Sequence, residues 1–547
     1  TSFQNGSFAY VPAALTGGTP QWPALTQLSG DFLLDRTSLA VKGVTGKVEG
    51  LTSAQIVKGE GVIPNLGGSL SVQVSLDARG PLAEALSFIA RSPIQGWTGQ
   101  ALAKATGTGN ADYRVKLSLP ISEIEKTKVQ GTVTLANSDV QISPDIPAFS
   151  RVKGAVQFSE AGFNLQNMQG GLLGGDVRAE GGTVRPVTGA VMGPQRGEPA
   201  ILIKGQGTVT AEGLRQAGEL GILSRLAHSA SGAASYTASV GIRRGVPEIS
   251  VSSSLQGLAL NLPPPLNKAA ETVLPLRFEN ALLQGLPAGR LQDQLTVDLG
   301  RIGNVQFVRD LSGPEPRVLR GGIGVGLQEG ESIPMIDEGV AANLRLQAVD
   351  IDAWDSALSR AAGVKLSPAP AAGPSSAAMT YLPTVIALRA KELQLGGHRL
   401  HEVVSGGGRE GLNWRVNLDS TELSGYFDYR QSQGLNPGRV YARLSRLNIP
   451  ASAQNEVEAL LDEPPTSIPA LDIVVEDLEL RGKRLGRVEI EAINRSAGAV
   501  MGGSSGGGVR EWRLNKFNVI VPEAKFSAVG NWAALGASAA ANVPRVE

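Results

Sequence analysis

The chain has 547 residues, several times the length of a typical domain, and its 50 Lys and Arg residues balance its 50 Asp and Glu residues. A nucleic-acid partner needs a basic surface, so a net charge of zero argues against one. Cysteine is absent, which excludes disulfides, thiolate metal sites and cysteine nucleophiles. With 42% hydrophobic residues and 69 glycines, the composition is typical of a globular or sheet-rich protein and not of a disordered one.

The chain begins at Thr1 without an initiator Met, and no apolar run approaches the ~20 residues needed to span a bilayer. We therefore expect a fragment of a longer protein, with any anchor or targeting segment outside it.

Alternation of apolar and polar residues is the main pattern of the sequence. In residues 70–77, LSVQVSLD, every second side chain is aliphatic, which predicts a half-buried antiparallel strand with one apolar and one polar face. Turns rich in Gly, Pro, Asn and Asp separate the similar runs that follow. These runs lie at 114–119, 294–299, 343–348, 414–419, 488–493 and 511–515.

Four short helices are predicted at 80–92, 212–226, 350–363 and 452–465, each after a strand. The fold class expected is therefore mainly β: a long, curled antiparallel β-sheet trough built from repeated modules, with a few short helices. Three segments rich in Gly, Pro and Ser are expected to be linkers or hairpin tips, namely 185–199, 367–378 and 497–508.

Internal duplication is visible in the sequence. Residues 22–46 align without gaps to 146–170, and 391–403 align to 476–488 with apolar positions kept in phase. Shorter matches relate 113–119 to 236–242, 129–135 to 255–261, and 414–418 to 512–516. Such duplication predicts an array in which each β-unit pairs with its neighbours.

We divide this continuous array into four parts. They are β-module 1 (1–145), β-module 2 (146–270), β-module 3 with the linker 367–378 (271–385), and a C-terminal duplicated hairpin region (386–547).

Candidate metal and nucleotide sites are weak. His398 and His401 could form a metal pair, but residues three apart on a strand point to opposite faces, so two surface histidines are the preferred interpretation. Asp350, Asp352 and Asp355 could hold a cation, but first-turn acids with Asp352 as N-cap are preferred. The glycines of 170–175 and 205–207 lack a strand–GxGxxG–helix context and are expected in turns.

Catalytic motifs are also missing. No GxSxG occurs, and His228 stands in a predicted helix without triad partners, so no enzyme activity, cofactor or metal is predicted. A glycosidase carboxylate pair is not indicated, although the sequence does not exclude one. Trp414 and Trp512 occupy equivalent repeat positions; they could stack on a ligand, but sheet packing is preferred.

A long sheet with one apolar face must cover that face or offer it to an apolar ligand. Few aromatic residues are present to fill an interior, which favours an open trough. The predicted lining is the apolar face of the central strands, where acyl chains would be held by dispersion forces and exclusion of water. These residues are Leu70, Val72, Val74, Leu76, Val115, Leu117, Leu119, Val133, Leu135, Val156, Phe158, Leu344, Leu346, Val416 and Leu418.

Four segments also carry a family resemblance: 119–175, 253–268, 469–494 and 511–532. Through them the chain resembles the YhdP branch of the AsmA-like superfamily of Gram-negative envelope proteins. The resemblance implies a periplasmic, bridge-like β-trough whose full-length protein is anchored in the inner membrane. It implies that the trough carries phospholipids between the inner and outer membranes, which would be contacted through segments outside this fragment.

Two alternatives remain. One is a non-catalytic envelope scaffold or assembly factor with a closed, filled β-sheet, whose edges would dock partner strands. The other is a glycan-acting enzyme or carbohydrate binder, which needs convergent carboxylates or exposed aromatic residues in a cleft.

Overall fold

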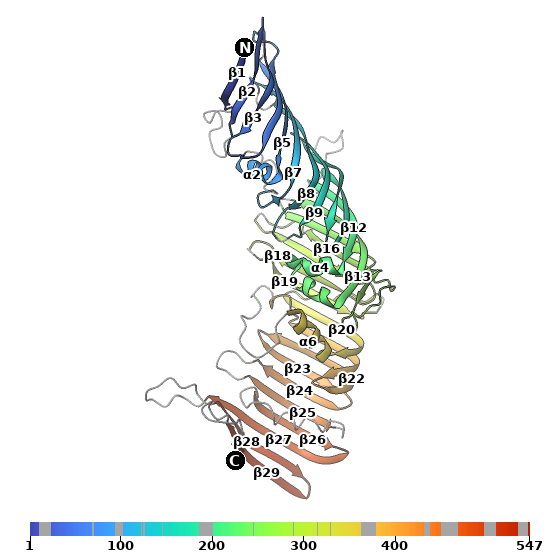
Figure 1. Ribbon diagram of the computed structural model, residues 1–547. Coiled ribbons are helices and arrows are strands. Elements are labelled where there is room, and N and C mark those ends of the chain that lie inside the picture. The colour runs from blue at the N-terminus through green and yellow to red at the C-terminus, as the bar shows by residue number, and fades with distance from the viewer. Residues whose placement is uncertain are drawn as a thin grey trace, which may run out of the picture. The chain divides into compact units, whose positions relative to one another are not determined.

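The structure is a computed structural model of the chain. It describes residues 1–9, 23–67, 70–92, 102–121, 123, 126–144, 146–184, 201–243, 246–287, 289–313, 315–328, 330–362, 379–431, 438–449, 469–496, 510–533 and 545–546. The described chain divides into two compact units (Figure 1). Unit 1 comprises Thr1–Asn261 and Lys268–Gly285, and unit 2 comprises Leu262–Asn267 and Leu286–Glu547.

Unit 1 contains the first strands and two of the α-helices that follow strands. Its strands are β1 Ser2–Phe8, β2 Leu25–Asp35, β3 Ser38–Val48, β4 Gln55–Ile63, β5 Ser71–Pro81, β6 Thr106–Gly107, β7 Asn110–Pro120, β8 Lys128–Gln141, β9 Phe149–Ser159, β10 Gly162–Leu172, β11 Gly175–Thr183, β12 Ile201–Thr210, β13 Ala230–Arg243, β14 Val246–Ser253, β15 Leu258–Leu260 and β16 Leu276–Leu282. Its helices are α2 Leu82–Arg91, α4 Ala211–Gln216, η2 Gly218–Leu220, α5 Ile222–Leu226 and η3 Ala227–Ser229.

Unit 2 has the same mainly β character. Its elements are β17 Gln292–Asp298, β18 Gly303–Asp310, β19 Arg317–Val325, β20 Gly339–Asp350, α6 Ile351–Ala362, β21 Val385–Leu395, β22 His398–Glu410, β23 Asn413–Asp419, β24 Leu423–Arg430, β25 Arg439–Ile449, β26 Ala470–Leu480, β27 Lys483–Ser496, β28 Arg510–Val521, β29 Ala524–Ala533 and β30 Arg545–Val546.

Strands pair with their neighbours along the chain in each unit. Unit 1 runs antiparallel from β1 to β14 and on to β16, with β6 and β15 as short additions on β8 and β13. Unit 2 runs from β17 to β30. Among the described residues, no pairing joins the first strand of a unit to its last, so each sheet is open. The predicted mainly β class with few helices is confirmed.

Three pairs of unit 2 depart from the predicted antiparallel order: β19–β20, β20–β21 and β25–β26 are parallel. Parallel neighbours need a crossover that returns the chain to the same edge. The helix α6 lies in one such connection, and period-two alternation alone carries no information on strand direction.

The first predicted repeat is confirmed at the level of single residues. The hairpin of β2 and β3, Leu25–Asp35 and Ser38–Val48, has the same bounds as the hairpin of β9 and β10, Phe149–Ser159 and Gly162–Leu172, when the two are superposed by the sequence alignment. The registers of both hairpins shift at the same two places.

Backbone bulges occupy matching positions of the two hairpins. Gln27 and Arg151 have φ of 53° and 52°, and Gly43 and Asn167 have φ of 61° and 49°. A bulge bends its strand and increases its local twist. Bulges that line up on neighbouring strands therefore curl the sheet, which agrees with the predicted curled form.

The second repeat is confirmed in its first part. β21 and β26 each have eleven residues and end at equivalent hairpin turns. The buried cross-strand pairs Ala390–Val403 and Val475–Val488 occupy aligned positions. The proposed match of 129–135 to 255–261 is wrong in register.

The register difference between these segments is large. Thr132, which aligns with Leu258, pairs with Arg114, whereas Leu258 pairs with Gly232, five residues before Thr237, the residue that aligns with Arg114. The bounds of the four predicted modules stay a prediction. Strand pairing between β8 and β9 continues across the boundary at 145/146, so pairing does not mark where one module ends and the next begins.

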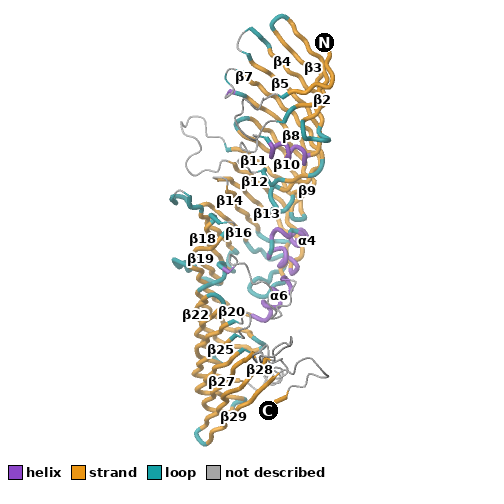
Figure 2. Tube along the Cα trace, turned by 90° about the vertical axis from the view of Figure 1, so that its left-hand side faces the viewer, coloured by secondary structure: helices purple, strands orange, loops and turns teal. Residues whose placement is uncertain are grey.

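Helices of unit 1 lie where β5 and β12 end, at the edge that we call the helix edge; Figure 2 shows α4 beside the strand ends. α2 contributes Leu82 to a core with Ala111, Leu135 and Val152. α4 contributes Ala211 to a separate core cluster on β12 and β13. Each helix therefore covers the apolar face of the sheet only near this edge.

Acidic side chains in the first helical turns attach helices to hairpin turns. The Glu84 carboxylate of α2 accepts hydrogen bonds from the backbone of Thr52, Ser53 and Ala54 at 2.8–3.3 Å. These bonds, led by the one from the Thr52 hydroxyl, lower the pKa of Glu84. The attachment connects α2 to the β3–β4 turn.

The N-cap of α6 lies two residues before the predicted Asp352. Asp350, and not Asp352, accepts from the backbone N–H of Ala353 at 2.7 Å. Asp352 instead accepts from Gly396 and Gly397 in the β21–β22 turn, which lowers its pKa. Both acids are thus used structurally, as the preferred interpretation expects.

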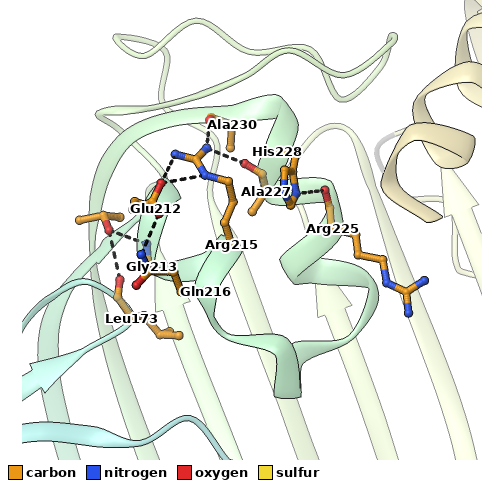
Figure 3. A network of polar contacts seen from close by, with 10 residues as sticks. Leu173, Glu212, Gly213, Arg215, Gln216, Arg225, Ala227, His228 and Ala230 are labelled. Atoms are coloured by element: carbon orange, nitrogen blue, oxygen red, sulfur yellow. Dashed lines mark hydrogen bonds and ion pairs between the residues drawn. The ribbon is translucent and has the colours of Figure 1, made fainter. Parts of the chain in front are cut away.

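The predicted helix 212–226 is divided into α4, η2 and α5, followed by η3 (Figure 3). Ala217, with ψ of 74°, ends α4, and Gly221, with φ of 57° and ψ of −114°, separates η2 from α5, because neither residue has the dihedral angles of an α-helix. The Arg215 guanidinium closes the assembly by donating to the carbonyls of Ala227 and Ala230 at 3.2 and 3.1 Å. The predicted helix 452–465 and the three Gly/Pro/Ser-rich segments lie outside the described residues.

We expect Gly213→Ala to destabilise unit 1 by roughly 1–3 kcal/mol or more, the usual cost of overpacking. A Cβ at Gly213 would lie 1.9 Å from the carbonyl carbon of Leu173, and backbone cannot move aside easily. The measurement is urea unfolding of the whole chain. Gly218→Ala is the control, since a Cβ there meets no atom within 4 Å, and equal midpoints for the two variants would contradict the expectation.

Candidate functional site

The predicted lining residues of β5, β7, β8 and β9 occupy one face of the unit 1 sheet. Directly opposed residues on paired strands point to the same face. The pairs that join these strands are Val72 with Leu119, Val74 with Leu117, Leu76 with Val115, and Val133 with Val156. The pairings bring residues distant in sequence into continuous apolar rows.

Three further predicted residues lie at the margins of these rows. Leu70 directly precedes β5. Leu135 is buried against Leu82 of α2, so the helix covers it. The Phe158 ring lies over Gly131, where a Cβ would be 2.2 Å from the ring.

The same face extends across unit 1 beyond the predicted set. Cross-strand partners connect it from β7 to β16 without a break. Alternation within a strand shows which of its residues share a face. Which of the two faces joins the apolar face of the next strand depends on the pairing register, and the sequence does not specify where bulges shift that register. The residues missed are Tyr113, Val129, Phe163, Leu165, Ile203, Val240, Ile249, Val251 and Phe278.

Burial distinguishes this face from a closed core. Every predicted lining residue except Leu135 is half-buried in the described structure. Fully buried apolar residues gather in small clusters, beside α2 and α4 in unit 1 and around Val403 and Val475 on the same face in unit 2. The lining side chains therefore contact each other along the sheet while part of their surface stays accessible.

The opposite face of unit 1 is polar. Asp77 accepts from Arg114 at 3.2 Å, and Arg79 donates to Asp112 at 2.5 Å. Both ion pairs are exposed, and exposed pairs stabilise a fold little. Their effect is to keep this face hydrated, so the sheet presents one apolar and one wet surface.

The four predicted residues of unit 2 also share one face. Leu344 pairs with Leu388, and Leu388 and Leu418 both pair with Ser405. Leu346 pairs with Ala390, and Val416 pairs with Gly407, so these two lie on the adjacent rows. The row of Val416 continues through Phe427, Ala442, Ile473, Ile490 and Phe517.

The other face of unit 2 carries a charge network. Glu489 accepts from Lys516 at 2.6 Å and from Asn518 at 3.1 Å, and Arg487 lies 2.9 Å away. The hydrogen bond from Lys516, followed by that from Asn518, lowers the pKa of Glu489 to about 2. The carboxylate therefore stays ionised, and this face is hydrated like that of unit 1.

The structure places His398 and His401 in β22, and Glu422 binds the second of them. Within the described residues, no group of three or more His, Asp or Glu side chains is placed to hold a metal ion. The Nδ1 of His401 instead lies 2.6 Å from Oε1 of Glu422, whose other oxygen accepts from the His401 backbone N–H. This agrees with the interpretation of surface histidines.

We expect His401 to titrate above the usual range in an NMR pH titration, because the hydrogen bond and charge of Glu422 raise the pKa of its imidazole. A raised pKa means that the interaction stabilises the folded chain at low pH and is lost as the pH rises through the raised value. Glu422→Gln should bring the midpoint down, and Glu392→Gln, which acts only through space, should change it less. If Glu422→Gln left the titration midpoint of His401 unchanged, Glu422 would not be the cause of the raised pKa.

The remaining candidates occupy structural positions. The Trp414 ring has the Arg409 guanidinium 5.9 Å from its centroid, and the Trp512 indole N–H donates to the Pro469 carbonyl at 3.2 Å. The glycines of 170–175 form the end of β10, the turn and the start of β11, whereas those of 205–207 lie within β12, so the prediction of a turn at 205–207 is wrong. None of the helices described is both long and apolar enough to cross a bilayer.

Comparison with known proteins gives one match. The family model described as YhdP protein matches residues 2–543. No curated protein and no solved structure matches the chain.

Proposed function

This chain belongs to the YhdP family, and from this premise we propose that its apolar sheet face carries the acyl chains of phospholipids. The observation that carries the proposal is the set of half-buried apolar rows that extend from strand to strand opposite a charged face. Apolar surface gains about 25 cal/mol per Å² when it leaves water, so hydrocarbon chains that cover these rows are favoured. The contact is non-directional, which allows chains to slide along the rows.

The headgroups would remain in water. Acyl chains that lie on the apolar rows leave a polar headgroup free to project beyond a strand end, where no desolvation of its charge is needed. No catalytic residue, metal or cofactor has a role in such carriage.

We place this carriage in the periplasm, between the inner and outer membranes, as the family resemblance implies. The partners would be phospholipids and the two membranes, with the full-length protein anchored in the inner membrane. Membrane contacts would be made by parts of the protein other than these sheets.

The envelope scaffold is disfavoured by the burial of the lining. A closed, filled sheet would bury the side chains of Val74 and Leu117, which are half-buried in the described structure. The open edges of both sheets are common to the two proposals and do not separate them.

Mass spectrometry of lipids bound to the chain tests the proposal. The protein is purified from membranes in mild detergent, and phospholipids per chain are counted. We expect several phospholipids per folded chain. One lipid per chain would indicate a discrete site, and none would favour the scaffold.

A further inference from the structure

One segment of unit 2 lies over the apolar face at β18. Residues 379–384 precede β21, and the Tyr381 ring packs edge-on against Phe307 of β18, with centroids 5.3 Å apart and planes at 84°. Phe307 lies on the apolar face opposite Leu295 of β17. Beneath the tyrosine, Phe307 and its core neighbour Val340 are only 8% and 0% exposed.

Hydrogen bonds hold this segment on the sheet. The Thr384 hydroxyl accepts from the N–H of Val340 at 3.0 Å and donates to its carbonyl at 3.1 Å. The Arg409 guanidinium donates to the carbonyls of Met379, Leu382 and Pro383 at 3.0–3.2 Å. The segment is therefore anchored on both sides of Tyr381.

A buried ion pair orients the tyrosine itself. Arg309 donates from Nε and Nη2 to the two oxygens of Asp293 at 2.9 and 2.5 Å, and from Nη1 to the Tyr381 hydroxyl at 3.3 Å. Asp293 is 1% exposed. Burying two charges is costly unless both are well bonded, so this pair holds its geometry firmly.

The cover, and not the strand length, sets this section apart, because β17 and β18 have seven and eight residues, as do β23 and β24. The apolar face of β17 carries Asp293, Leu295 and Val297, and Leu299 continues it beyond the end of the strand. The ion pair occupies the row of Asp293 and Arg309, and Tyr381 covers the next row, that of Leu295 and Phe307.

We propose that Tyr381 and Phe307 form a constriction in the acyl-chain path, and that Arg309 is the positioning residue that holds Tyr381 over Phe307. This inference rests on the proposed function and adds a width limit to it. The cover takes the rows of Asp293 and Leu295 out of the path and leaves those of Val297 and Leu299, each roughly 7 Å along the strand, since side chains on one face of a strand are two residues apart. Fewer acyl chains therefore fit side by side here than on an uncovered section of the same strand length.

The test places photoreactive benzoyl-phenylalanine at Phe307 or at Phe427 in the full-length protein and measures phospholipid adducts by mass spectrometry. Phe427 is the matched control, because it is a half-buried phenylalanine on the same apolar face, outside the Tyr381 contact and on a strand of the same length as β18. We expect the adduct yield at Phe427 to exceed that at Phe307 at least fivefold. Tyr381→Ala should raise the yield at Phe307 at least fivefold and leave that at Phe427 within twofold.

Two further variants keep the test decisive. Tyr381→Phe retains the ring and loses only the bond to Arg309, so its effect should be smaller than that of Tyr381→Ala. If Tyr381→Ala does not fold, the double variant Asp293→Leu with Arg309→Met removes the ion pair without leaving a lone charge and should also raise the yield at Phe307.

The outcomes separate the two proposals. Equal adducts at Phe307 and Phe427 in the unmodified chain, or a yield at Phe307 that does not respond in a folded Tyr381→Ala chain, would overturn the constriction and leave lipid carriage intact. Absence of adducts at Phe427 as well would overturn the proposed function, and the constriction with it.

Discussion

Leu117→Asp is expected to lower the number of phospholipids bound per chain at least tenfold. Leu117 lies between Val74 and Val129 on the apolar face of unit 1, so acyl chains that follow these rows must pass it. An unpaired carboxylate that a hydrocarbon chain strips of water costs several kcal/mol, roughly 2–7 for a polar group and more for a charge. The measurement is lipid occupancy by mass spectrometry on the full-length protein.

The control for Leu117→Asp is Ser118→Asp, which adds the same charge to the polar face of the same strand. Ser118 pairs with Gln73 and Lys128, so its carboxylate would stay hydrated, and lipid occupancy should stay within twofold. The Leu117→Asp chain should still fold, because Leu117 is half-buried and water reaches an open face. Loss of folding with Leu117→Asp would favour the closed scaffold, and normal occupancy in a folded variant would exclude Leu117 from the path.

Asp293→Ala is expected to destabilise unit 2 by about 3–5 kcal/mol, the usual cost of leaving one partner of a buried ion pair uncompensated. The side chains of Asp293 and Arg309 are 2% and 15% exposed, so water cannot replace the lost carboxylate. Urea unfolding followed by a probe in unit 2 measures the effect. Tyr381 should loosen as well, because Arg309 binds both groups.

Two controls show whether burial is the cause. Asp77→Ala breaks the exposed pair with Arg114 and should cost at most about 1 kcal/mol. The double variant Asp293→Leu with Arg309→Met should recover most of the lost stability, since apolar replacement of a buried pair is often neutral. An equal loss from Asp293→Ala and Asp77→Ala would show that the pair does not behave as buried.

Much of the fold was predictable from the sequence, because local patterns reflect local physics. Alternation over residues 70–77 predicts which side chains share a face, since successive residues of a strand point to opposite sides. The alignment of 22–46 with 146–170 predicted two hairpins that match in bounds and in bulge positions. Both conclusions need only neighbouring residues or a comparison of the chain with itself.

Part of the candidate site could not be predicted in this way. The missed residues Leu165 and Ile203 join the apolar face through Gly181, and the β10–β11 register shifts directly beyond Leu165; one shifted residue changes the face of a whole strand. Likewise, Asp352 looks like an N-cap in sequence, but its carboxylate binds the backbone of the β21–β22 turn, which lies 44 and 45 residues later in the chain.

The order of residues is enough to predict a two-faced, repetitive β-chain, because alternation and duplication are properties of that order, and the resemblance of four segments predicts the family. Where the apolar face is covered follows only from contacts between distant segments. Tyr381, Phe307, Arg309 and Asp293 come from three separate segments. Their contact depends on how strands pair and where the crossover returns, which no local pattern encodes.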